Sequence, residues 1–147
     1  MPTRNSTDKP VTRAAGVVPV RFAGDAPRFL LLRCFSYWDF PKGELEPDEE
    51  PLAAALREAE EETSLTGLSL RWGEDWIETE RYGRGKIARY YIAEAAHGDV
   101  TLPVSAELGR PEHDEWRWVS AEEADALLNP RLRRVLAWAR ARIEHPG

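Results

Sequence analysis

The first apolar segments of the chain predict a β-hairpin. The segment from Ala14 to Phe22 is rich in valine and holds Gly16 and Pro19, which is typical of a strand with an edge or a bulge. Phe29 to Leu32 is an uninterrupted apolar run, as expected of a buried strand. Gly24 to Pro27 supplies turn residues between the two runs, so we expect the strands to pair.

The next segment predicts a loop followed by the clearest helix of the chain. Proline and glycine interrupt residues 38–47, which indicates a loop. Glu49 to Thr63 then has helical spacing, with Asp48 as its expected cap and Pro51 in its first turn. Four apolar residues at this spacing form one stripe that should pack on a sheet: Leu52, Ala55, Leu56 and Ala59.

The rest of the chain alternates between strand and helix patterns. Aromatic and β-branched residues predict strands within 65–82, 86–95 and 115–119, with a turn at 82–85. Ser120 to Glu123 has the form of a capping box, and Asn129-Pro130 opens a last amphipathic helix. The order of these elements predicts an α+β fold in which a mixed sheet lies between helices.

Composition and charge restrict the class of protein. A chain of 147 residues fits one domain, which we place at residues 13–147 behind a polar tail of residues 1–12. The formal net charge of −6 argues against broad nucleic-acid binding. The single cysteine, Cys34, fits a reducing compartment, and neither a secretory signal nor a membrane-length apolar run is present. We therefore expect a cytoplasmic protein, and a monomer.

The predicted helix at 49–63 carries an acidic face with unfavourable electrostatics. Glu58, Glu61 and Glu62 are spaced by three and four residues, so their like charges repel one another. They also lie in the second half of the helix, where the macrodipole disfavours anions. A bound divalent cation would compensate both effects. The alternative is a solvated acidic face, which is common on helices.

The residues before and around these glutamates follow a fixed spacing. The segment runs from Gly43 through five residues to Glu49, then through seven residues to Arg57-Glu58-Ala59-Glu60-Glu61-Glu62-Thr63-Ser64-Leu65. This resembles the Nudix box, and departs from it where Ser64 replaces a glycine. Ser64 must adopt a left-handed conformation, or the helix must close differently, with Gly67 taking the turn. The resemblance implies the Nudix-type α/β/α sandwich and Mg²⁺-dependent hydrolysis of a nucleoside polyphosphate.

The same resemblance assigns roles to the glutamates. It implies that Glu58 and Glu62 chelate Mg²⁺, for which Mn²⁺ can substitute, and that Glu61 is the general base and a further ligand. Arg57 is expected to orient a carboxylate, and Gly43 to let the backbone approach metal or phosphate. Several family members add a carboxylate from a distant loop. In this chain we expect Glu112 to supply it, the alternative being an exposed loop acid.

Two further segments suggest a substrate. Trp38 to Gly43 is similar to the loop of asymmetric diadenosine tetraphosphate hydrolases, in which Lys42 would hold a phosphate. Lys86 and an aromatic pair resemble a strand of the same enzymes, within a basic stretch over residues 81–89. Tyr82 or Tyr90 could stack on adenine, as could Tyr91, although sheet tyrosines are often core and Lys86 could be a solvated strand end.

Three other functions remain open at this stage. An RNA 5′-pyrophosphohydrolase and a diphosphoinositol polyphosphate hydrolase would use the same box on another substrate. A non-catalytic Nudix-fold binding module is also possible, but such proteins usually lose carboxylates that this chain retains. The three histidines lack metal-ligand spacing, so we interpret His97, His113 and His145 as surface residues, and Cys34 as a packing residue.

Overall fold

The computed structural model describes residues 10–145. Its strands are β1 (Thr12–Ala23), β2 (Ala26–Cys34), β3 (Tyr37–Asp39), β4 (Lys42–Glu44), β5 (Trp76–Glu78), β6 (Lys86–Glu94) and β7 (Glu115–Val119). Its helices are α1 (Pro51–Thr63), α2 (Ala121–Leu127) and α3 (Pro130–Glu144). The first strand begins at Thr12, and most of the polar tail predicted for residues 1–12 lies outside the described residues.

The strands form one mixed sheet that branches along β1. Strand β1 pairs in parallel with β6 from Thr12 to Val20, and every other pairing is antiparallel. On its other side, β1 pairs first with β4 and further along with β2. Strand β2 then pairs with β3 on one edge and with β7 on the other. The predicted hairpin and the mixed sheet are both confirmed.

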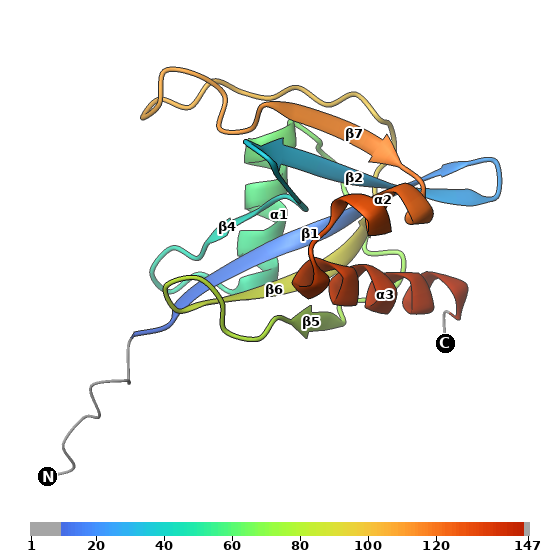
Figure 1. The fold of residues 1–147 in the computed structure, drawn as a ribbon, viewed down its shortest axis with the longest axis horizontal. Helices are drawn as coiled ribbons and strands as arrows, with labels where there is room; N and C mark the ends of the chain where they lie inside the picture. Colours follow the sequence, from blue (N-terminus) through green and yellow to red (C-terminus); the bar gives the residue numbers. More distant parts are fainter. Residues whose placement is uncertain (1–9, 146–147) are drawn as a thin grey trace, which may run out of the picture.

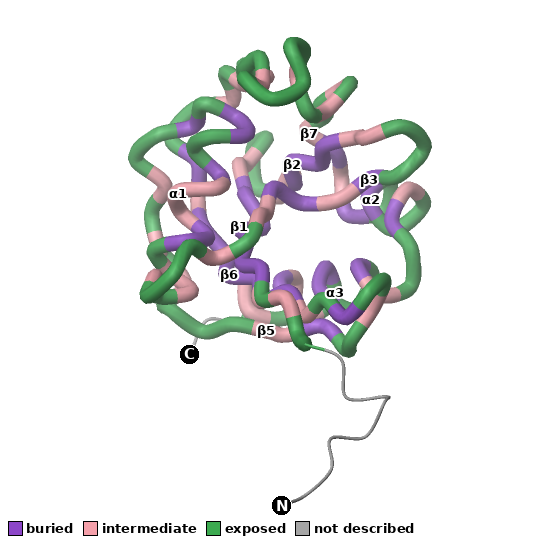
Figure 2. The backbone as a smooth tube through the Cα atoms, turned by 90° about the vertical axis from the view of Figure 1, so that its left-hand side faces the viewer, coloured by how far each residue is buried: buried purple, intermediate pink, exposed green. Residues whose placement is uncertain are grey.

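Helices cover both faces of this sheet. Helix α1 lies on one side, and α2 and α3 lie on the other, which gives a three-layer α/β/α sandwich (Figures 1 and 2). The predicted stripe of α1 packs on the sheet: Ala55 and Ala59 are fully buried against β1 and β6, and Leu52 and Leu56 pack at the margin. The opposite layer is the larger core and includes Phe29, Tyr90 and Leu136.

Helix α1 does not begin as the sequence suggested. Its cap is Glu50, whose side chain makes no capping bond, and its first residue is Pro51. Asp48, the expected cap, has a positive φ of 63° and lies before the helix. Glu49 stabilises the turn before the helix instead, because its carboxylate accepts a hydrogen bond of 2.9 Å from the backbone N–H of Glu46. The predicted capping box of α2 and the Asn129 cap of α3 are both confirmed.

Two stretches differ from the predicted strand pattern. Residues 38–47, expected as a loop, contain β3's last two residues and all of β4, because these short segments pair with β2 and β1. Within 65–82, regular strand is limited to Trp76–Glu78, with one isolated bridge at Ser69 and another at Tyr82. Leu68 and Leu70 are used for packing rather than for pairing.

Candidate active site

The three glutamates of α1 differ sharply in their exposure. Glu62 is buried, Glu58 is half-buried and Glu61 is exposed. The glutamates differ in exposure because Ala59, which lies between Glu58 and Glu61 in sequence, packs against the sheet. Helix α1 ends at Ser64, which has φ 64° and donates from Oγ to the carbonyl of Thr101 at 3.1 Å. Ser64 therefore takes the left-handed position itself.

Arg57 contacts carboxylates from both the loop and the helix. Its guanidinium donates to both oxygens of Glu49 at 2.8 Å, to Glu58 at 2.8 Å and to Glu61 at 3.1 Å. The paired bond from Arg57 lowers the pKa of Glu49 to about 2. The guanidinium also donates to the backbone carbonyl of Glu44 at 3.2 Å. Arg57 thus fixes the loop before α1 to two of its glutamates.

Glu62 has the most unfavourable environment for a negative charge. Burial, followed by the nearby carboxylates of Glu112 and Glu58, raises the pKa of Glu62 to about 9. The backbone N–H of Lys42 donates to its Oε1 at 3.2 Å and opposes this shift only weakly. Burial also raises the pKa of Glu58. A divalent cation at this place would stabilise the charged forms of both side chains.

Gly43 is required by the position of Glu58. A Cβ at Gly43 would overlap the carboxylate of Glu58, so a larger residue here would push that carboxylate out of its place. The sequence predicted a close approach of metal or phosphate to Gly43. In the structure the group that approaches is the side chain that the family resemblance names as a metal ligand.

The predicted site residues meet around one cavity of about 590 Å³. Those that line it are Lys42, Gly43, Glu58, Glu61, Glu62, Lys86 and Glu112. Its remaining walls, which the sequence did not single out, are Ala14, Glu44, Ser105, Ala106 and Glu107. Among the described residues, no three histidine, cysteine or acidic side chains are close enough together to enclose an ion as they lie. The carboxylates surround the cavity, and Arg57 holds two of them at its margin.

Lys42 and Lys86 enter this cavity from different strands. The Lys42 ammonium lies 2.8 Å from Asp39 Oδ2, and its side chain is 22% exposed. The pKa of Lys42 is raised: burial lowers it, but Asp39, followed by Tyr82 and Glu62, raises it by more. Asp39 also accepts a bond of 3.0 Å from the Tyr90 hydroxyl. Sequence reasoning missed Asp39, because its role depends on the pairing of β3.

The aromatic residues proposed for base stacking have different surroundings. Tyr90 is fully buried in the core, so the prediction that its ring stacks on adenine is wrong. Tyr91 is also buried, at 3% exposure, beneath α1. Both are buried because β6 lies inside the sheet, with helices on each face. Tyr82 is half-buried, and the guanidinium of Arg131 lies 3.7 Å from the centre of its ring.

His113 was predicted to be a surface residue, and this is wrong. Its side chain is 14% exposed, and Nε2 lies 3.9 Å from Glu62 Oε1. It lines a hollow of about 180 Å³ beside the main cavity, together with the glutamates of α1 and Glu112. Burial lowers the pKa of His113, which favours the neutral imidazole. The acidic residues around it in sequence gave no sign of this burial.

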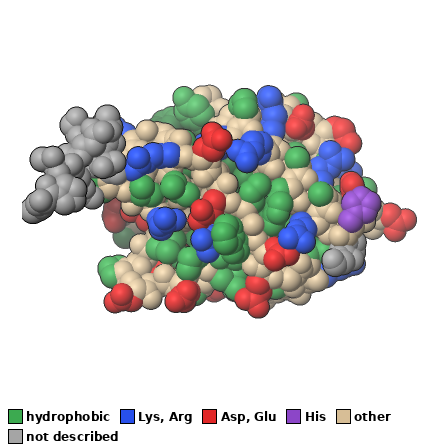
Figure 3. All heavy atoms as spheres, turned by 90° about the horizontal axis from the view of Figure 1, so that it is seen from below, with side chains coloured by type: hydrophobic (Ala, Val, Ile, Leu, Met, Phe, Trp, Pro, Cys, Tyr) green, Lys and Arg blue, Asp and Glu red, His purple; other side chains and the backbone are tan. Residues whose placement is uncertain are grey.

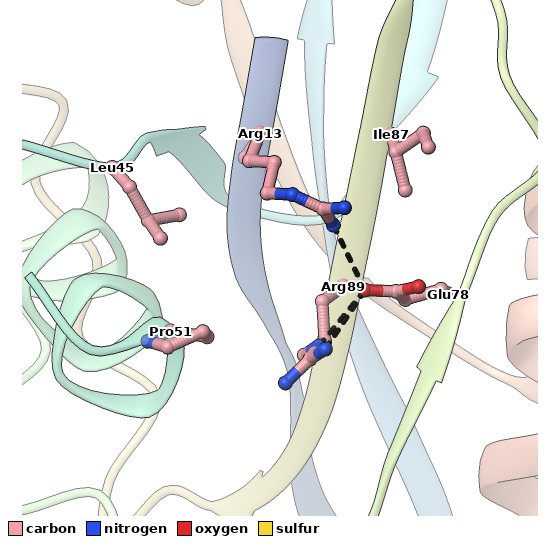
Figure 4. Close-up of a pocket in the computed structure, with 7 residues that line it drawn as sticks. Arg13, Leu45, Pro51, Glu78, Ile87 and Arg89 are labelled. Carbon is pink, nitrogen blue, oxygen red and sulfur yellow. Dashed lines mark hydrogen bonds and ion pairs between the residues drawn. The ribbon is translucent and has the colours of Figure 1, made fainter. Parts of the chain in front are cut away.

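The basic stretch at 81–89 does not act as one surface. Lys86 lines the main cavity, whereas Arg89 lines a second cavity of about 330 Å³ on the α1 side of β1 and β6. There Arg89 and Arg13 both bind Glu78, opposite Leu45 and Pro51 (Figure 4). The face over β5 and α3 also has basic and acidic side chains interspersed (Figure 3). Arg89 is therefore not placed to contact a phosphate chain in the main cavity.

Comparison with known proteins identifies the family. The family model of the NUDIX domain matches residues 10–139. The chain belongs to the Nudix family. This Nudix protein is 34% identical over 120 residues to the bis(5′-nucleosyl)-tetraphosphatase (asymmetrical) of Caenorhabditis elegans, an alignment that covers 78% of this chain and 83% of the relative. It is also 32% identical over 105 residues to an RNA pyrophosphohydrolase of Acidiphilium cryptum, covering 63% of each chain.

Solved structures give the same assignment for the Nudix fold. The crystal structure of a C. elegans Ap4A hydrolase binary complex superposes with a TM-score of 0.74 at 26% identity, over 91% of this chain and 98% of the other. The Nudix α/β/α sandwich predicted from sequence is confirmed, and the protein is a pyrophosphohydrolase. Within residues 10–145, no helix is both long and apolar enough to cross a membrane.

Proposed function

We propose that this Nudix hydrolase cleaves diadenosine tetraphosphate asymmetrically, to ATP and AMP, with Mg²⁺ as its divalent cation. The observation that carries the proposal is the single cavity that holds Lys42 and Lys86 together with the four carboxylates of Glu58, Glu61, Glu62 and Glu112. Two cations and a carboxylate cluster suit a long polyphosphate better than a short one. The C. elegans relatives named for this activity support the same substrate class.

The carboxylates have the chemistry of a Mg²⁺ site. Glu58 and Glu62 would hold the ion, with Glu112 and Glu61 as further oxygen donors, because Mg²⁺ prefers carboxylate and water oxygens. When bound, the ion neutralises phosphate charge and polarises the phosphorus that is attacked. Glu61 is exposed to the cavity, and from there its carboxylate takes the proton of the attacking water. Arg57 positions Glu58 and Glu61 without reaching the substrate.

The two lysines would hold the phosphate chain from strands on either side of β1. Lys42 is held by Asp39, and Lys86 begins β6, so the two ammonium groups come from different parts of the sheet. A chain that contacts both would cross β1, because Lys42 pairs with Gly16 on one edge of this strand and Lys86 with Thr12 on the other. Tyr82 forms a backbone β-bridge with Lys86. Its aromatic ring is therefore near the end of the phosphate chain that Lys86 would hold, where one adenine would stack. This register directs water to a phosphorus away from the centre of the chain.

Product analysis tests the register. Diadenosine tetraphosphate incubated with the enzyme and Mg²⁺ in ¹⁸O-water should give ATP and AMP, with the label in only one of them. Two molecules of ADP would show that the register is wrong. Triphosphorylated RNA and nucleoside triphosphates belong in the same panel, since RNA pyrophosphohydrolases are also among the relatives. If RNA is turned over faster than diadenosine tetraphosphate, RNA is the preferred substrate and the dinucleotide proposal is wrong.

The role of Lys86 can be tested with a matched control. Lys86→Ala should raise KM for diadenosine tetraphosphate at least tenfold, but should change KM for ATP much less, because a shorter chain need not reach that lysine. Arg84→Ala removes a charge from the neighbouring turn, at an exposed residue that is not part of the cavity lining. This control should leave both constants near their original values. Equal losses with both substrates would refute the role of Lys86.

A further inference from the structure

Two aromatic rings are displayed to solvent at the β2–β3 hairpin. Phe35 is 69% exposed and Tyr37 is 72% exposed, more than any other large hydrophobic side chain of residues 10–145. Both lie within three positions of each other on one short connection. Trp38, between Tyr37 and Asp39, is by contrast packed into the core at 9% exposure. Phe35 and Tyr37 therefore stay exposed although the adjacent Trp38 is buried.

The backbone of Phe35 is in a conformation that favours glycine. Cys34 pairs with Tyr37, so Phe35 and Ser36 are the two connecting residues of the hairpin. Tight hairpins of this length require a positive φ at the first connecting residue, where glycine, asparagine or aspartate is usual. Phe35 has φ 56° at this position. A bulky exposed ring is thus present where neither packing nor backbone geometry calls for one.

The turn is attached to the loop that lines the active-site cavity. The N–H of Phe35 donates to Asp114 Oδ2 at 2.9 Å, and its carbonyl accepts from Arg33 at 2.6 Å. Arg33 also binds Glu115 at 3.1 Å. Asp114 directly follows His113, which lines the hollow beside Glu62. These contacts fix the backbone of Phe35 relative to the loop that carries His113.

Tyr37 continues the same edge toward Lys42. Side chains two apart on a strand point to the same face, so Tyr37 and Asp39 lie on one side of β3. The carboxylate of Asp39 binds the Lys42 ammonium at 2.8 Å. Both lysines line the cavity; Tyr82 forms a backbone β-bridge with Lys86, and Tyr37 lies two residues before the Asp39 that binds Lys42.

We propose that Phe35 and Tyr37 form a stacking platform for the second nucleobase of the substrate, at the end of the phosphate chain held by Lys42. The inference rests on the proposed function, since it requires a substrate with a nucleoside at both ends. A purine base has a large aromatic face that exposed rings can cover without hydrogen-bond readout. The anchored turn holds the Phe35 backbone in place before the base arrives, which reduces the backbone entropy lost on binding.

The test compares two ligands that differ only in the second nucleoside: diadenosine tetraphosphate and adenosine 5′-tetraphosphate. Affinities are measured with Mg²⁺ by calorimetry on Glu62→Gln protein, so that no ligand is consumed. Phe35→Gly with Tyr37→Thr should weaken binding of the dinucleotide roughly 10- to 100-fold, the range expected for one lost base stack. Binding of adenosine tetraphosphate should change less than twofold.

Controls separate the platform from the fold and from the proposed function. Phe35→Gly suits the positive φ, so the melting temperature should be equal or higher. Trp76→Thr removes another exposed aromatic ring, on β5, and should leave both affinities unchanged. Equal losses for the two ligands, or no loss for the dinucleotide, would overturn the platform. Turnover of the dinucleotide by the unaltered enzyme is a separate result, and its absence would count against the proposed function alone.

Discussion

Replacing Glu62 by glutamine should make the metal-free protein more stable while removing its activity. Glutamine cannot ionise, but its amide oxygen can still accept the 3.2 Å bond from the Lys42 backbone. The pKa of Glu62 is about 9 in the folded protein, against an ordinary value of 4.5. Between these values the unfolded chain is ionised at this position and the folded chain is protonated. Stability must therefore fall as the pH rises through this interval, and the cost is constant above it.

The size of the effect follows from the same shift. Each pH unit within the interval lowers the unfolding free energy by about 1.4 kcal/mol. From pH 4.5 to about pH 8 the sum is about 5 kcal/mol, an upper bound because water and side-chain movement relax a buried charge. Glu62→Gln should lack this contribution, so the difference between the two proteins should grow with pH.

The assay is urea denaturation of both proteins at several pH values, with EDTA and then with Mg²⁺. In EDTA the variant should be the more stable protein above about pH 6, by a margin that widens to about pH 9. Added Mg²⁺ should stabilise the original protein far more than the variant, because the ion compensates the charge on Glu62. Parallel stability curves in EDTA would refute the account of Glu62, and a variant that unfolds would make the residue structural.

Four further outcomes follow from the site and the helix end. Excess EDTA should abolish hydrolysis and Mg²⁺ or Mn²⁺ should restore it, whereas full turnover in chelator would exclude the metal site. Gly43→Ala should lower kcat at least tenfold with a small change in melting temperature, since the new methyl displaces the Glu58 carboxylate. Ser64→Gly should raise the free energy of unfolding by up to about 1 kcal/mol in thermal unfolding, because glycine relieves the left-handed strain. A net loss of stability would mean that the hydrogen bond from Ser64 to the Thr101 carbonyl outweighs this strain. His113, whose pKa is lowered by burial, should cost stability as the pH falls below its ordinary value of 6.5, and His113→Gln should flatten that part of the unfolding curve.

The parts of the fold that were predictable are those set by nearby residues. Helix α1, the β1–β2 hairpin and the Ser120 capping box each depend on a repeating or contiguous pattern. Strands β3 and β4 were missed because each has three residues and exists only through pairing with a strand elsewhere in the chain. Propensity cannot detect such segments when proline and glycine flank them.

The candidate site divides in the same way. The fixed spacing on α1 indicated Glu58, Glu61 and Glu62, and the family resemblance indicated Lys42, Lys86 and Glu112. All six line the same cavity. Burial could not be predicted with equal success. Tyr90 belongs to a strand covered on both faces, so alternation does not distinguish its core side from an exposed side. His113 lies among loop acids but is packed beside Glu62.

The branching of the sheet along β1 has a consequence for how this enzyme can change. A strand edge can pair with only one neighbour at each position, so β4 and then β2 pair with successive parts of the same edge of β1. Helix α1 lines the main cavity and the hollow beside it, and other walls of both come from residues within 102–113, between β6 and β7. Insertions into this loop could change the range of substrates without moving a carboxylate of α1. The glutamates of α1 and this loop thus lie in separate parts of the chain, so the loop can change while it keeps Glu112 and leaves α1 as it is.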